Sequence, residues 1–147
     1  MTMVTNERQI LSDLQDAMVR RAEQLVLDLN LSTGEGVLKG KTQASKALEV
    51  AQTAGSLPVF VNWLRYQAGR ERSADFWTKQ AGKHSLARAL AEDLGWLQKE
   101  VGARLPGTDR KQQSDATMRA ATRFLGYFRR ALIGADYLDK IQLPEAK

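Results

Sequence analysis

The chain alternates between long segments in which apolar residues recur every three or four positions and short segments rich in glycine, serine or proline. Recurrence at this interval is typical of amphipathic helices. The first segment predicts a helix over about 6–29, because its apolar residues share one face: Ile10, Leu11, Leu14, Met18, Ala22, Leu25 and Leu29. Residues 25–31 also alternate as in a strand, but no other segment reads as a partner strand, so a helix is favoured.

Two further helices are predicted in the middle of the chain, over about 41–54 after a glycine-containing loop at 32–36, and over 57–69. Ser56 is the expected cap of the second of these, and Pro58 lies in its first turn, where proline is tolerated. This helix is apolar nearly all round, which predicts that it is the central and most buried element.

The second half of the chain predicts a short helix over about 73–81, a longer one over about 85–101, and a last one over about 108–140. The segment 134–136, Gly-Ala-Asp, is a candidate break near the end of the last helix. The fold class predicted by this pattern is all-α, a compact bundle of five to six helices in a single domain over 1–147.

Composition narrows the class of protein. Of the 147 residues, 43% are hydrophobic and 27% are charged, as in soluble globular proteins. The chain has no cysteine, which excludes disulfides and thiolate metal sites and favours a reducing compartment. Its first residues resemble no signal peptide, and no apolar run approaches the ~20 residues that cross a bilayer. We therefore expect a cytoplasmic protein that does not engage membranes.

Charge is distributed unevenly along the chain, whose formal net charge is +5. Residues 1–35 hold three arginines and six acidic residues, whereas residues 38–88 hold nine basic and three acidic residues. Such a division suggests a polyanion as one partner and a protein as another. An ordinary basic protein with solvated charges would have the same total.

A glycine-rich stretch, Gly34-Glu35-Gly36-Val37-Leu38-Lys39-Gly40-Lys41-Thr42, partly resembles a phosphate-binding P-loop. A P-loop needs four residues between its glycines, so that successive backbone N–H groups surround the phosphates. Here five residues separate Gly34 from Gly40, and the carboxylate of Glu35 would repel phosphate. A glycine-rich connection into the next helix is favoured over a nucleotide site.

No constellation of catalytic or metal-binding residues stands out. His84 is the single histidine, and it is expected near a helix start because zinc sites and catalytic triads need several partners. The acidic pairs Asp13 with Asp16 and Glu92 with Asp93 are expected on solvated faces. We therefore expect no enzyme activity, no catalytic residues, no metal and no cofactor.

The three tryptophans are candidates for stacking on nucleobases. Trp63 belongs to the all-apolar helix and is expected in the core. Trp77 and Trp96 lie off the main leucine stripe of their segments, so core and surface positions both stay open for them.

The strongest functional signal lies on the last helix. At 100° per residue, Arg119, Arg123 and Arg130 fall within about 40° of one another. They lie opposite an apolar arc that contains Phe124 and Phe128. No acidic residue interrupts the row between 119 and 130, and Arg129 flanks it. Guanidinium groups fit phosphate, so the row predicts contact with a nucleic-acid backbone, although an exposed helix face must carry polar residues in any case.

A second basic group precedes and follows the apolar helix, in loops and at helix ends where side chains are accessible. Its members are candidates for the same binding surface: Lys39, Lys41, Lys46, Arg65, Arg70 and Arg72.

Two stretches carry a family resemblance. One comprises 41–46, the junction Ala54-Gly55-Ser56-Leu57-Pro58 and Asn62-Trp63-Leu64, and the other is the helix 118–130. Both are similar to segments of the small helical subunit of type III CRISPR effector complexes. The resemblance implies a bundle that stacks in several copies along the guide–target duplex of this antiviral ribonucleoprotein. It also implies non-specific contact with RNA, or with single-stranded DNA, and association with other subunits of the complex, without catalysis.

The alternative hypothesis is a protein–protein adaptor that uses the acidic first helix or an exposed tryptophan surface. An enzyme ranks third. A helix-turn-helix repressor ranks fourth, because the second helix of 41–70 is too apolar to lie in a major groove.

Overall fold

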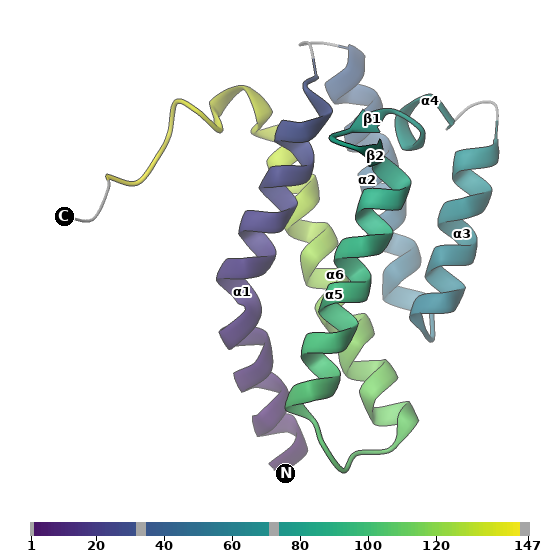
Figure 1. The fold of residues 1–147 in the computed structure, drawn as a ribbon, viewed down its shortest axis with the longest axis vertical. Coiled ribbons are helices and arrows are strands. Elements are labelled where there is room, and N and C mark those ends of the chain that lie inside the picture. Colours follow the sequence, from purple (N-terminus) through teal and green to yellow (C-terminus); the bar gives the residue numbers. More distant parts are fainter. Residues whose placement is uncertain (1, 32–34, 71–73, 145–147) are drawn as a thin grey trace.

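A computed structural model describes residues 2–31, 35–70 and 74–144. In these ranges the chain forms six α-helices, one small hairpin and a 3-10 turn (Figure 1). The elements in order are α1 (Thr2–Leu29), α2 (Glu35–Thr53), α3 (Leu57–Gly69), α4 (Ala74–Trp77), β1 (Gln80–Ala81), β2 (His84–Ser85), α5 (Leu86–Arg104), α6 (Arg110–Ile133) and η1 (Ala135–Tyr137). The predicted all-α bundle of five to six helices is confirmed.

The central element is α6, which packs against α1, α2, α3 and α5. Its apolar arc is buried as predicted, and Phe124, Leu125 and Phe128 are completely inaccessible. In Figure 1 α6 lies behind α5, with α1 on one side and α2 on the other. The core of the molecule is therefore built around the last long helix of the chain.

The prediction that 57–69 is the central element is wrong. Helix α3 lies at the edge of the bundle, on the side opposite α1 (Figure 1). Only Leu57, Phe60, Leu64 and Gln67 of this helix are buried, whereas Val59 and Tyr66 are 54% and 61% exposed. An apolar composition favours burial of a helix but does not determine which other helices pack against it. The two long helices α1 and α2 cover α6 instead.

Three of the predicted helix starts coincide with capping interactions. The Ser56 hydroxyl accepts from the Val59 N–H at the start of α3, and the Ser85 hydroxyl accepts from the Arg88 N–H at the start of α5. Asp109 and Gln112 form a capping box at the start of α6. Helix α1 continues to Leu29 with its predicted apolar face buried, which decides against the strand reading of 25–29. The candidate break at 134–136 is confirmed, because α6 ends at Ile133 and η1 follows.

Three segments differ from prediction. The last helix, expected over about 108–140, ends at Ile133. Helix α2 begins at Glu35 rather than near residue 41. The helix expected over about 73–81 ends at Trp77, after which β1 and β2 pair in antiparallel fashion. Gly82, with φ of +70°, lies in the turn of this hairpin, where glycine is preferred. The hairpin directs Ala81 into the core, where it is 4% exposed.

Aromatic side chains fill the space between α3, α4 and α2. Trp77 is completely buried, and its indole N–H donates to the Gln43 side-chain oxygen at 3.0 Å. The Trp77 ring meets Phe76 and the half-buried Trp63 edge to face, at centroid distances of 4.9 and 6.2 Å. Trp63 and Trp77 therefore pack with the core and present no stacking platform to a ligand.

Membrane insertion finds no support in the described helices, since none combines the length and the apolar character needed to span a bilayer.

Candidate nucleic-acid interface

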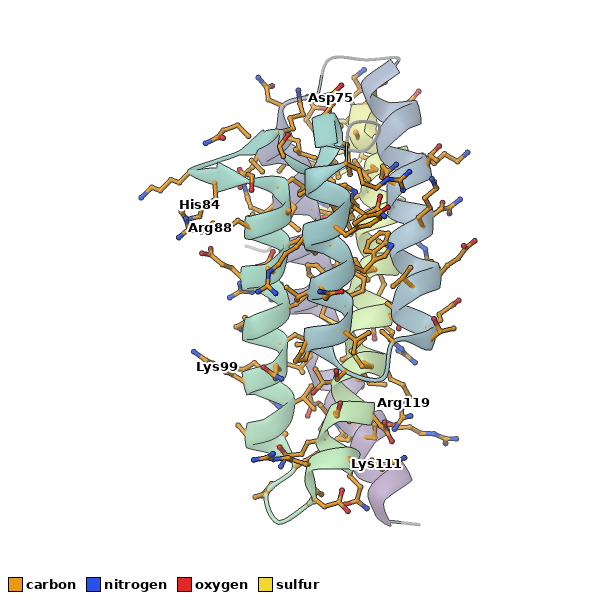
Figure 2. All side chains as sticks on the ribbon, turned by 90° about the vertical axis from the view of Figure 1, so that its right-hand side faces the viewer. Asp75, His84, Arg88, Lys99, Lys111 and Arg119 are labelled. Carbon is orange, nitrogen blue, oxygen red and sulfur yellow. The ribbon has the colours of Figure 1, made fainter. Side chains whose placement is uncertain are left out.

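The arginine row of α6 lies on the solvent-facing side of the central helix. Arg119, Arg123 and Arg130 are exposed, and the buried residues Phe124 and Phe128 lie on the opposite side of the same helix. Figure 2 shows Arg119 on one side of the bundle, and His84, Arg88 and Lys99 on the other. The row therefore points away from the side of the bundle that α5 covers.

Arg119 is already bound to a carboxylate. Its Nε lies 2.9 Å from both carboxylate oxygens of Glu7 on α1, and one Nη lies 2.6 Å from Oε1. This bidentate contact raises the pKa of Arg119 further above its ordinary value. The prediction that Arg119 is free to bind phosphate is therefore corrected, because its guanidinium is paired with the Glu7 carboxylate on α1. The reason is that α1 crosses α6 with an acidic residue at this level.

Arg123 and Arg130 keep their charge available. Within the described part of the chain, no carboxylate lies within 4.0 Å of either guanidinium. Arg130 lies over the ring of Tyr127, with 5.9 Å between the guanidinium carbon and the ring centroid. A cation–π contact of this kind leaves the guanidinium N–H groups free to bind an anion. These two arginines form the open part of the row.

Helix α2 lies beside the row on one side. The Arg129 Nε donates to the Ser45 hydroxyl at 2.8 Å, so Arg129 is half-buried between α6 and α2. Lys41 precedes Ser45 by four residues and therefore lies on the same face of α2, where it is exposed. Lys46 is also exposed but follows Ser45 directly, about 100° away around the helix. Lys41 therefore shares the Ser45 face of α2 with the exposed acidic residue Glu49, which follows Ser45 by four residues. Lys46 points elsewhere.

The remaining basic candidates are not brought to this face. Arg65 and Arg70 belong to α3, at the edge of the bundle opposite α1 (Figure 1), and Arg70 lies 5.4 Å over the ring of Tyr66. Arg72 and the side chain of Lys39 lie outside the described residues. The prediction of a single basic surface is therefore corrected to a row on α6 with Lys41 of α2 beside it, whereas Arg65 and Arg70 lie apart from it on α3.

The described part of the glycine-rich stretch, 35–42, is helical, and Gly34 lies outside the described residues. The N–H groups of this part therefore run along the α2 axis rather than around a ligand. Gly40 has a packing role instead, because a Cβ built on it would lie 2.8 Å from Cε1 of Phe76. The absence of a side chain allows α2 to approach α4 and α6 closely.

An ion pair that the sequence reasoning missed joins α1 to α5. The Arg21 Nη1 lies 2.9 Å from Oδ1 of Asp93, whose side chain is only 14% exposed, and the guanidinium lies 4.0 Å over the ring of Trp96. Burial raises the pKa of Asp93, against the opposing effect of Arg21. A signal was present in the sequence, because Arg21 follows Met18 by three residues and therefore borders the apolar face of α1.

Further titratable groups lie beside this ion pair, and the prediction of a solvated face is wrong for Asp93. His84 Nε2 lies 3.7 Å from Oε2 of Glu92, next to the Arg21–Asp93 pair. Asp13 and Asp16 are exposed on α1, as predicted for a solvated face. Within the described residues, no group of three His, Cys, Asp or Glu side chains is arranged to hold a metal ion.

Comparison of the chain with protein-family models, with curated proteins and with solved structures returned no significant match.

Proposed function

We propose that this protein is a non-catalytic subunit that binds the sugar–phosphate backbone of RNA, in the manner of the small subunit of a CRISPR effector ribonucleoprotein. The observation that carries the proposal is the open pair Arg123 and Arg130 on the exposed face of the most buried helix. The resemblance of residues 41–64 and 118–130 to that family supports the same reading.

The spacing of the two arginines suits a backbone ligand. Seven residues of helix separate them, which is about 10 Å along the axis of α6. A strand that follows α6 would place one phosphate at Arg123 and another at Arg130. Such contacts do not read base sequence, and stacking of several subunits along one strand would add their weak affinities together.

Charge reversal tests the proposal, because Arg123 and Arg130 are exposed and their replacement leaves the core unchanged. The test is fluorescence anisotropy with a labelled generic single-stranded RNA, comparing wild type with an Arg123→Glu/Arg130→Glu variant. We expect at least about tenfold weaker binding at low salt. We also expect the slope of log K against log salt to fall by about 0.7 for each lost phosphate contact. Arg119→Ala should weaken binding less than Arg123→Ala, because Glu7 already balances the Arg119 charge.

The matched control is Arg88→Glu/Lys99→Glu, which makes the same change in net charge on the opposite side of the bundle (Figure 2). If this control loses as much affinity as the Arg123/Arg130 variant, binding reflects net charge and the row is not the interface. If neither variant changes affinity, or no RNA binds, the proposal is wrong.

The adaptor hypothesis retains one supporting observation, the exposed acidic pair Asp13 and Asp16 on α1. Its tryptophan surface is not supported, because Trp77 is buried and Trp63 and Trp96 are half-buried. An adaptor would bind a protein partner with little salt dependence, and it would be unaffected by charge reversal on α6.

A further inference from the structure

A groove of about 840 Å³ opens where the arginine row ends. It lies between α1, the last turns of α6 and the segment that follows η1. Its polar and aromatic lining comprises the rings of Tyr127 and Tyr137, the cation Arg130, and the amides Gln15 and Gln142. Apolar side chains form much of the rest: Val19, Ala131, Leu138, Ile141 and Leu143. One acidic residue, Glu23, also contributes to the lining.

We propose that this groove receives an unpaired base of a single-stranded nucleic acid, with Tyr137 as the stacking partner. The proposal rests on the proposed function, since it assumes that phosphates follow the α6 row. It adds the form of the ligand, a single strand, and a contact to bases in addition to the backbone.

One aromatic residue of the groove has the exposure that stacking requires. Tyr137 is 56% exposed, whereas Tyr127 is half-buried and lies under the Arg130 guanidinium. Each ring has a cation beside it, Arg130 at 5.9 Å for Tyr127 and Lys140 at 5.5 Å for Tyr137. Aromatic rings next to basic groups are the usual composition of surfaces that bind single strands, because rings stack on bases of any sequence while the cations bind phosphate.

Arg130 connects the groove to the row, because it belongs to both. A strand whose phosphates contact Arg123 and Arg130 would bring the following nucleotide to the mouth of the groove. In a duplex the bases stack on each other and face inward, so only an unpaired base has a free face for Tyr137. The amides of Gln15 and Gln142 supply hydrogen-bond donors and acceptors for base edges.

The test compares two labelled strands of equal charge, an oligouridine of about 15 nucleotides and a strand of the same length with abasic sugars. We expect wild type to bind the oligouridine at least about fivefold more tightly, which is the lower end of base–aromatic stacking. Tyr137→Ala should remove this difference, and Tyr137→Phe should keep it. The matched control is Tyr66→Ala, which removes an equally exposed ring beside Arg70 on α3 and should keep the difference.

Each contrary outcome has a distinct meaning. If wild type binds both strands equally while Arg123→Glu/Arg130→Glu still weakens binding, the groove proposal is overturned and the backbone proposal stands. If neither strand binds, both proposals are overturned. If Tyr137→Ala changes only self-association in sedimentation, the groove with its exposed Ile141 and Leu143 receives protein side chains, and the base-binding proposal is overturned.

Discussion

Asp93 is the acidic residue whose surroundings most affect its protonation. Its side chain is 14% exposed between α1 and α5, and it contacts Arg21 at 2.9 Å. Loss of hydration disfavours the carboxylate, and the guanidinium favours it. The net effect is a pKa above the ordinary value of 3.8. The ionised carboxylate therefore carries a cost in the folded state that the unfolded chain does not have.

The sign of this shift predicts how stability depends on pH. Between pH 3.8 and the raised pKa, the folded state binds more protons at Asp93 than the unfolded state, so stability from this group increases as pH falls. The free energy of unfolding of wild type should therefore rise relative to Asp93→Asn as pH is lowered from 7 to about 4. Urea unfolding of both proteins at a series of pH values measures the difference. A difference that shrinks on acidification would mean that the Arg21 ion pair outweighs burial.

At the residue scale, sequence periodicity predicted on which side of a helix a residue lies, but not which residues of other helices it contacts. It placed Arg119, Arg123 and Arg130 on the outer side of one helix, because 100° per residue fixes that angle. It could not predict the Glu7 contact. That contact depends on where α1 crosses α6, 112 positions away in the chain. For the same reason Arg21 and Asp93 were not recognised as a pair.

Helix packing depends on one position of α2 where a side chain has no room. Gly40 faces Phe76 and Leu132, and a Cβ there would lie 2.8 Å from the Phe76 ring, which is buried and 3% exposed. Gly126, in the middle of α6, would place a Cβ in open space. Both glycines have a helical backbone conformation, but only Gly40 lies against a neighbouring side chain.

Replacing each glycine by alanine should therefore change stability in opposite directions. Gly40→Ala should destabilise the fold by about 1–3 kcal/mol through overpacking, in spite of the higher helix propensity of alanine. Gly126→Ala should stabilise it by about 0.5–1 kcal/mol. Chemical denaturation measures both values. Stabilisation by Gly40→Ala would show that Phe76 moves aside without cost.

At the element scale, the long helices were predicted from the spacing of apolar residues, and the start of α3 from the cap Ser56. The short elements were not predicted. Residues 35–40 resemble a loop by composition, but they extend α2 because Gly40 packs against Phe76 and Leu132. The hairpin at 80–85 follows from tertiary placement of Ala81 in the core. Two-residue strands are too short to leave a period-two pattern in the sequence.

The molecule as a whole is organised around α6, which contacts α1, α2, α3 and α5. Helix α3 is peripheral by comparison, and its outward residues Val59 and Tyr66 are exposed. Apolar composition led to the wrong choice of central helix. Helices α3 and α6 each contact four elements of the described chain, but the long helices α1 and α2 cover α6 far more extensively than any neighbour covers α3, and this coverage follows from topology.

Native-state hydrogen exchange should show the same ranking. Backbone amides of α6 over about 120–132 should exchange slowest, through opening of the whole domain, and those of α3 should exchange faster through local opening. Mass spectrometry of peptides from the two helices gives the comparison. Equal protection of α3 and α6 would contradict the peripheral role assigned to α3.

Because the arginine row lies on α6, a bound ligand should be released by global unfolding of the domain and not by local opening. A polyanion bound by Arg123 and Arg130 would contact the helix that we expect to unfold last. Fraying of α3 or of the hairpin would leave it in place. Binding of the polyanion should therefore raise the melting temperature of the whole domain, because a ligand that binds only the folded state increases the free energy of unfolding.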